Sequence, residues 1–463
     1  RKIGTRSCDA CKIRKVKCSQ TPPCERCVAI GVECTFNKRQ ATRGPRSLRP
    51  RTIEQIQQAQ RTPVQNPVEG TPPEATPRDV TVESLVVRLC IYRLRLFPVW
   101  PIVAVEEVIA ALQRDAHDVE TRLLAIAVGA ATMAQLKLER FQDAGVNDDS
   151  TAASLEAECQ RIRGSLDRGI ANLNSIRTAF FLHIYHENQH PGGTKSLLYL
   201  REAITLGQIL GLHRGSSYLG LSPAEDRLRR RLLWLLFVTE RGVAMLHKLP
   251  VVLQRAERLP PLDGGGVDEE AHILPAFKKL VSLFWIFDQS HAFEVLQEAS
   301  DNIGGMSTGS ASSLNREVLD LLQRRLQDLP MDMSSGGNDV QKADIFVTKQ
   351  WMQVLLWRAT LCNWAASPSS SSTLVAGPIQ IAQEFLDLIC QLPHSAIESH
   401  GPAIEFKVYE IASAVADSVE TRFGLPNADL RPGDVIMRLQ RILATSRGGN
   451  NKLLQLLAMR LSQ

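Results

Sequence analysis

Six cysteines lie within the first 34 residues of this 463-residue chain, in two copies of one spacing pattern. The first copy reads Cys8-x2-Cys11-x6-Cys18 and the second reads Cys24-x2-Cys27-x6-Cys34. Each cysteine therefore has a counterpart sixteen residues later. A segment this short cannot build a hydrophobic core of its own, so the cysteines have to supply the cross-links that hold it together.

The cysteine count favours zinc over disulfides. Three disulfides would suit a secreted protein, but no signal peptide is recognisable, although the chain starts at Arg1 and not at a methionine. In a reducing compartment, paired CxxC motifs are typical of zinc sites, in which four ligands surround each ion. One zinc would leave two thiols unused, and two separate zincs would need eight. Two Zn²⁺ ions fit six thiols only if two cysteines bridge both ions, and the spacing alone leaves open which two.

Positive charge is concentrated beside the cysteines. Residues 1–51 carry 14 Lys/Arg and 3 Asp/Glu, whereas the rest of the chain carries 40 and 46. A basic head on a mildly acidic body indicates that the head alone meets a polyanion. The head has no amphipathic apolar face for a membrane, so nucleic acid is the expected polyanion. We expect no membrane contact, because the longest apolar run, Leu123 to Leu136, is short and rich in Ala and Gly.

The two cysteine repeats differ in what they carry between their second and third cysteines. The first insert, KIRKVK, contains Lys12, Arg14, Lys15 and Lys17, whereas the second, VAIGVE, contains no base and one acid, Glu33. A run of charge is usually only a solvated surface. Here the charges are absent from the matching insert, which favours a functional role. We expect a short helix from near Asp9 to face the DNA and its counterpart to act as a brace.

The six-cysteine spacing and the basic insert resemble the binuclear zinc cluster, Zn₂Cys₆, of fungal transcription regulators, a module that places a helix in the DNA major groove. The resemblance implies that Cys8 and Cys24 bridge the two zincs. It also implies that Arg14 and Lys15 read bases in CGG-type triplets. Arg and Lys commonly donate to guanine O6 and N7. We expect phosphate contacts from Lys12, Lys17 and Arg26, which would fix the register of the protein on the duplex.

Residues 36–51 are basic and contain Gly44, Pro45 and Pro50, so they predict an extended arm along the DNA backbone and a nuclear import signal. The cations expected to contact DNA in this arm are Lys38, Arg39, Arg43 and Arg46. Residues 52–61 offer about one heptad of coiled coil, which is too little to hold a dimer. We expect either monomeric binding or a homodimer formed through the large domain. Residues 52–80 are interpreted as a short helix followed by a disordered linker.

From about residue 81 to residue 463 the hydrophobic pattern is helical, which predicts a large all-α domain. Thr194 is the expected N-cap of a helix over 194–211, and Ser222-Pro223 is the expected start of another that carries the apolar run LLWLLFV. The stretches at 96–103, 198–215 and 229–253 resemble the fungal-specific transcription factor domain, or middle homology region. That resemblance implies a non-enzymatic nuclear regulator of RNA polymerase II transcription that contacts the transcription machinery and controls carbon or sugar metabolism or a metabolic gene cluster.

Residues 186–190, HENQH, match the H-E-x-x-H signature of zinc hydrolases, so a hydrolase with an appended DNA-binding head is the alternative. That chemistry needs both histidines on one face of a helix, with the glutamate as base. Pro191 follows directly and disfavours helical geometry at His190. The cysteines outside the cluster, Cys90, Cys159, Cys362 and Cys390, are expected to be buried free thiols.

Overall fold

The computed structural model describes residues 7–36, 80–138, 150–165, 171–255, 258–262, 272–289, 316–329, 338–364, 377–421 and 432–462. The chain divides into two compact units, residues 1–78 and 79–463. The predicted basic arm with its cations, and the predicted linker up to residue 79, lie outside the described residues. No strand occurs in the described part of the chain, and the predicted fold class, a small cysteine cluster followed by a large helical domain, is confirmed.

Within residues 7–36, the N-terminal unit forms two short helices, α1 (Asp9–Ile13) and α2 (Glu25–Val28). Its buried apolar side chains among residues 7–36 are four cysteines. The larger apolar side chains Ile13, Val28, Ile30 and Val32 are all exposed, by 46% to 67%. Residues 7–36 therefore have no hydrocarbon core that would stabilise them by burial.

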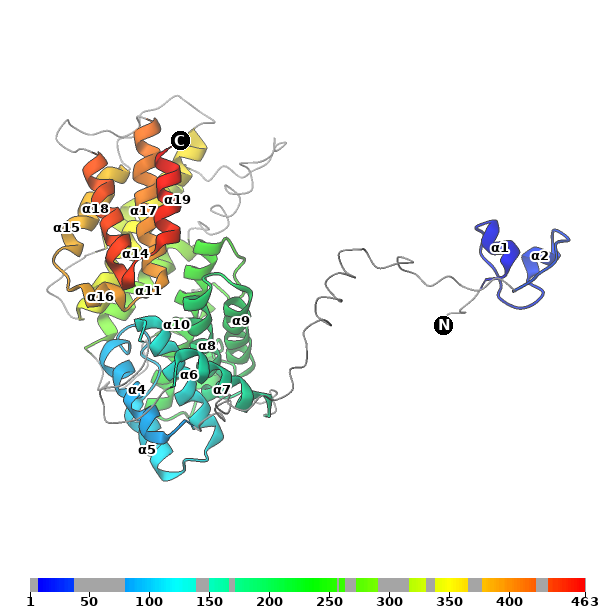
Figure 1. Cartoon of the computed structure of the whole chain (residues 1–463), viewed down its shortest axis with the longest axis horizontal. Helices are drawn as coiled ribbons and strands as arrows, with labels where there is room; N and C mark the ends of the chain where they lie inside the picture. Colours follow the sequence, from blue (N-terminus) through cyan, green and yellow to red (C-terminus); the bar gives the residue numbers. More distant parts are fainter. Residues whose placement is uncertain are drawn as a thin grey trace, which may run out of the picture. The chain divides into compact units, whose positions relative to one another are not determined.

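The second unit is a helical domain (Figure 1). Its first half comprises α4 (Val82–Arg95), α5 (Val105–Arg114), α6 (Val119–Leu136), α7 (Ala152–Gly164), α8 (Leu173–Gln189), α9 (Thr194–Ile209), the 3₁₀ turn η1 (Gly215–Tyr218), α10 (Pro223–His247) and α11 (Leu274–Gln289). Its second half comprises α13 (Arg316–Gln327), α14 (Asp339–Trp364), α15 (Pro378–Ile389), α16 (His394–Glu398), α17 (Pro402–Thr421), α18 (Pro432–Thr445), the 3₁₀ turn η4 (Ser446–Gly448) and α19 (Asn451–Leu461).

Two hydrophobic cores fill this domain, and α14 contributes to both. Trp351 and Met352 belong to the core that α4 to α11 build, whereas Val347 and Val354 belong to the core of α15 to α19. Helix α14 packs against α11 of the first group as well as against α15 and α17 of the later one. Residues on different faces of α14 thus pack into different cores, and the helix joins the two halves of the domain.

The helix starts follow the local sequence closely. Ser222 caps α10 as predicted, accepting a hydrogen bond from Glu225 N at 3.3 Å, and Pro223 is the first helical residue. The whole LLWLLFV run of α10 is buried, as predicted. The expected cap of α9 is off by one residue, because Gly193 is the N-cap and Thr194 is already helical.

Two other expectations need correction. The apolar run at Leu123 to Leu136 is part of the longer α6, the single described helix that is long and apolar enough to cross a membrane; 78% of it is buried inside the domain. It therefore has the character of a core helix. The expectation that this run is too short to cross a membrane is wrong, because the whole helix is long enough. Of the cysteines beyond the cluster, Cys159 is buried, but Cys90 and Cys390 are exposed, because they lie on the outer faces of amphipathic segments. The side chain of Cys362 lies outside the described residues.

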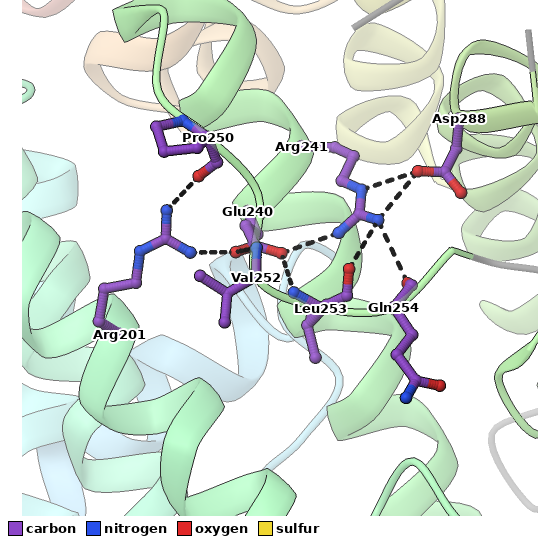
Figure 2. A network of polar contacts seen from close by, with 8 residues as sticks. All are labelled: Arg201, Glu240, Arg241, Pro250, Val252, Leu253, Gln254 and Asp288. Atoms are coloured by element: carbon purple, nitrogen blue, oxygen red, sulfur yellow. Dashed lines mark hydrogen bonds and ion pairs between the residues drawn. The ribbon is translucent and has the colours of Figure 1, made fainter. Parts of the chain in front are cut away.

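A buried ionic network fastens the segment after α10 to the domain (Figure 2). Glu240 of α10 is 1% exposed and accepts hydrogen bonds from Val252 N at 2.7 Å and Leu253 N at 3.0 Å. Arg201 of α9 donates to the same carboxylate and to the Pro250 carbonyl. One carboxylate therefore satisfies two backbone N–H groups of the segment that follows α10.

Arg241 completes this network from the other side. Its guanidinium is fully buried and contacts Asp288 of α11 at 2.9 Å and Glu240 at 2.8 Å (Figure 2). It also donates to the carbonyls of Leu253 at 3.1 Å and Gln254 at 3.2 Å. A buried arginine with two carboxylate partners and two carbonyl partners makes use of the planar fork of donors that distinguishes Arg from Lys.

Replacement of Arg241 by leucine should destabilise the helical domain by about 3–5 kcal/mol, because Glu240 and Asp288 would lose their shared buried cation. Urea unfolding of the full chain measures the change. Glu106→Ala is the control, since Glu106 is 71% exposed in its ion pair with Arg93 and should cost less than about 1 kcal/mol. Equal effects from the two substitutions would show that the buried network does not stabilise the domain.

Candidate metal centre and nucleic-acid interface

The six cysteine thiols of the N-terminal unit converge into two four-sulfur groups. Within each group the sulfur atoms lie within 4.8 Å of one another. One group contains Cys11 and Cys18, the other contains Cys27 and Cys34, and both contain Cys8 and Cys24. The two shared cysteines are those that the family resemblance implies as bridges. Among the described residues, no other group of His, Cys, Asp and Glu converges in this way.

The distances between the sulfur atoms fit shared metal ions and exclude disulfides. Cys8 Sγ lies 3.6 Å from the sulfurs of Cys24 and Cys27, and Cys11 Sγ lies 3.6 Å from that of Cys24. A disulfide would require about 2.05 Å. Four thiolates at about 2.3 Å from a tetrahedral zinc are separated by about 3.8 Å, close to the observed spacing. The residues present therefore fit two zinc ions that share two thiolates.

Backbone N–H groups point at the sulfur atoms and follow the repeat. Cys8 N donates to Cys18 Sγ at 3.5 Å, and Cys24 N donates to Cys34 Sγ at 3.2 Å, the equivalent contact sixteen residues later. Cys11 N donates to Cys8 Sγ at 3.4 Å, which lowers the pKa of the Cys8 thiol. Such donors stabilise the thiolate form that binds metal and orient the ligands around it.

The two halves of the unit share one backbone path. Cys8 and Cys24 are the N-caps of α1 and α2. After each helix the chain turns through a left-handed residue, which is Lys15 with φ of 54° in the first half and Gly31 with φ of 64° in the second. The left-handed region suits glycine, whereas a residue with a side chain adopts it at a cost of about 1–2 kcal/mol. A lysine at this turn therefore tolerates strain that its counterpart avoids.

The surfaces of the two halves are different. Lys12, Arg14, Lys15 and Lys17 are exposed in the first half, and Arg26 is exposed in the second. None of these five side chains has an acidic partner within ion-pair distance among residues 7–36. In the second half, the positions that match Lys12 and Arg14 are the exposed apolar residues Val28 and Ile30. One face of the first half is thus cationic and free to bind an anion.

The expected helix position needs refinement. Helix α1 begins at Asp9 as predicted, but it ends at Ile13, with Arg14 as its C-cap. Lys15 and Lys17 therefore lie beyond the helix, because the left-handed turn at Lys15 stops it. The predicted arm contacts Lys38, Arg39, Arg43 and Arg46 lie outside the described residues.

Sequence reasoning missed one structural contact in the cluster. Asp9 is 8% exposed; its backbone N donates to the Thr35 carbonyl at 2.7 Å, and its carboxylate accepts from the Thr35 hydroxyl at 3.1 Å. This contact closes the far end of the second repeat onto the first. An acidic residue at the start of α1 is a weak signal for it, because acids are common at that position of any helix.

Known protein families match both parts of the chain. The fungal Zn(2)-Cys(6) binuclear cluster domain matches residues 6–44, and the fungal specific transcription factor domain matches residues 98–261. The probable sucrose utilization protein SUC1 of Candida albicans is 32% identical over 90% of this chain and 79% of its own length. The maltose fermentation regulatory protein MAL63 of Saccharomyces cerevisiae is 24% identical over 97% of this chain and 92% of its own.

The chain belongs to the fungal Zn(2)-Cys(6) transcription factors. It is a DNA-binding regulator of transcription with two zinc ions in its N-terminal cluster. The six thiols would hold the two zinc ions, four around each with two shared, and a closed thiolate site of this kind would supply structural cross-links and not catalysis.

The hydrolase alternative is not supported in this Zn(2)-Cys(6) factor. Helix α8 ends at Gln189, and His190 is a non-helical C-cap with φ of −142°. Glu187 accepts hydrogen bonds from Gly192 N at 3.1 Å and from the Ser196 hydroxyl, and it lies 3.1 Å from His247 Nε2. The glutamate thus caps the turn into α9, and the two histidines of the motif do not converge on a common site.

The turn at Lys15 gives a testable difference between the two halves of the cluster. In the full-length zinc-loaded factor, Lys15→Gly should retain zinc at least as well as wild type in a chelator competition, because glycine adopts the left-handed turn without strain. Gly31→Lys introduces the same strain in the other half and should release zinc more readily. Loss of zinc from the Lys15→Gly variant would contradict this account of the turn.

Proposed function

We propose that the cluster recognises CGG-type DNA triplets and that all six cysteines, Cys8, Cys11, Cys18, Cys24, Cys27 and Cys34, ligate its two zinc ions, with Cys8 and Cys24 bridging. The observation that carries the proposal is the set of exposed, unpaired cations on one half of a frame that occurs twice. A metal-held frame fixes the positions of these side chains before DNA arrives, which lowers the entropy lost on binding.

Within this proposal, Arg14 and Lys15 read base edges, and Lys12, Lys17 and Arg26 contact phosphates. Arg14 is the C-cap of α1, and Lys15 forms the left-handed turn that follows it. Both are exposed residues at the C-terminal end of the helix. Guanine offers O6 and N7 as paired acceptors to such donors in the major groove. The phosphate contacts carry no sequence information but contribute most of the salt-dependent affinity.

The proposed division of the chain is a DNA-binding part at 1–51, a short helix and linker at 52–80, and a regulatory domain at 81–463. The basic arm extends the phosphate contacts through Lys38, Arg39, Arg43 and Arg46 and serves nuclear import. We assign the chain to the nucleus and assign it no enzymatic activity.

The regulatory domain is proposed to pair two copies of the chain, because residues 52–61 are too short for a stable coiled coil. The same domain is proposed to contact the RNA polymerase II machinery. The regulated genes are proposed to serve the use of carbon sources. Similarity over most of the chain to proteins named for sucrose utilisation and maltose fermentation supports this role over control of a biosynthetic gene cluster.

Arg14→Ala should weaken binding to a CGG duplex by about 1–3 kcal/mol and relax the preference at one base pair, since it removes a base-reading donor. Lys12→Ala should weaken all duplexes alike and reduce the slope of log affinity against log salt by about 0.9. Fluorescence anisotropy with matched and mutated duplexes at several salt concentrations separates the two effects.

Ile30→Ala is the matched control, because Ile30 occupies the position of Arg14 in the other repeat and is 47% exposed. It should leave DNA affinity unchanged. A loss as large as that of Arg14→Ala would mean that the insert of the second repeat also reads bases. Retention of full sequence preference by Arg14→Ala would overturn the assignment of base readout.

A further inference from the structure

Helix α1 is attached to the cysteine frame at its beginning, whereas the residues proposed to read bases lie at its end. Cys8 caps the helix and Cys11 lies in its first turn. Arg14 and Lys15 follow, and the next cysteine in the chain is Cys18. Two points of attachment leave a rigid helix free to rotate about the line that joins them. A third contact is therefore needed to fix where the end of α1 lies.

Asp9, the first residue of α1, makes such a contact with Thr35. Its backbone N–H donates to the Thr35 carbonyl at 2.7 Å, and its carboxylate accepts from the Thr35 hydroxyl at 3.1 Å. Asp9 is 8% exposed and is the single buried charged side chain among residues 7–36. Because one bond uses the backbone and the other uses the side chain, the pair fixes both the place and the rotation of this residue.

Thr35 is itself held on both sides, so it can serve as a fixed point for the helix. Cys34, directly before it, belongs to the second four-sulfur group. Phe36, directly after it, packs against the buried cysteines. A supporting residue that is locked by its own neighbours can hold a functional side chain in place, whereas a partner in a free loop would move with it.

The second repeat keeps part of this contact and omits the rest. Glu25 lies sixteen residues after Asp9, and Ser19 lies sixteen residues before Thr35. Glu25 N donates to the Ser19 hydroxyl at 3.1 Å, so the start of each helix contacts the end of the other repeat. The Glu25 side chain, however, is exposed. Within residues 7–36, the bond between a carboxylate and a hydroxyl thus occurs in the first repeat alone.

This asymmetry matches the distribution of the cations. Both repeats need a closed metal frame, so a contact that served zinc binding alone would be expected in both. The additional bond occurs instead in the half that carries Arg14 and Lys15. A negative charge near a cationic face also weakens its attraction for phosphates. Correct placement of the base-reading side chains would offset that cost.

We propose that Asp9 and Thr35 are positioning residues for base recognition: their two hydrogen bonds set the direction of α1 and hence the place of Arg14 and Lys15 in the major groove. The inference rests on the proposed function of the cluster and adds residues that supply no zinc ligand. A misdirected helix would lose the match between its donors and the paired acceptors of guanine. A helix that is already in place loses less entropy when DNA binds.

Thr35→Val removes the hydroxyl but keeps a branched side chain and the carbonyl that accepts from Asp9 N. In the full-length zinc-loaded factor, it should lower affinity for a CGG duplex about tenfold, as expected for loss of one hydrogen bond to a charged group. Affinity for a duplex with a mutated triplet should stay nearly unchanged. Fluorescence anisotropy with both duplexes gives the ratio of the two affinities. Zinc retention in a chelator competition should match wild type.

Two further variants make the comparison specific. Thr35→Ser restores the hydroxyl and should recover the wild-type affinity ratio. Ser19→Ala is the matched control in the other repeat and should leave the ratio unchanged. In an Arg14→Ala background, Thr35→Val should lower the ratio by a smaller factor than in wild type, because one of the side chains that it positions is absent.

Several results would overturn the positioning role. These are an unchanged affinity ratio in Thr35→Val, a lowered ratio that Thr35→Ser does not restore, a lowered ratio in Ser19→Ala, and equal effects of Thr35→Val with and without Arg14. Loss of zinc from Thr35→Val in step with loss of affinity would overturn it as well, because the contact would then serve the metal frame alone.

Selection of bound sites from random duplex DNA by the wild-type factor keeps this inference separate from the proposed function. A selected site without CGG triplets would overturn the proposed triplet readout. The affinity ratios of Thr35→Val and Thr35→Ser, measured on the selected site and a scrambled one, would still decide whether the contact positions α1.

Discussion

Zinc–thiolate bonding is the constraint on which the DNA-binding part of this protein depends. Among residues 7–36 the buried apolar side chains are cysteines, while Ile13, Val28 and Ile30 are exposed. Burial of hydrocarbon therefore contributes little to the free energy of folding, and metal coordination has to replace it. Because the same frame occurs twice, natural selection could place cations on one copy and leave the other as support. Function in this unit is a property of side chains that the metal frame holds in position.

The helical domain is stabilised by the opposite means, extensive apolar burial in two cores, with ionic groups that join helices and fasten the segment after α10. Arg241 and Glu240 fasten the segment after α10, and a few polar contacts, such as Gln135 to Ser399, join the cores. The two cores therefore meet along a boundary that polar contacts cross.

Much of the architecture could be predicted from the sequence, because cysteine spacing, apolar periodicity and the Ser222-Pro223 cap are local signals. Other features depend on contacts between distant residues, which no local pattern encodes. The left-handed turn that ends α1 at Lys15 follows from closure of the metal frame, since lysine itself does not favour that conformation. The contact between Gln135 and Ser399 joins residues 264 positions apart, so the way in which the two cores meet could not be anticipated from periodicity. Exposure of Cys90 likewise depends on which face of α4 packs inward.

The shared thiolates are the central claim, and metal stoichiometry tests them most directly. Two four-sulfur groups with Cys8 and Cys24 in common require two ions on six ligands. Native mass spectrometry of the full chain, purified without added chelator, reports that number together with the oxidation state of the cysteines. The account predicts a mass increase equal to two zinc ions and no disulfide. A single zinc, or a metal-free chain with three disulfides, would contradict it.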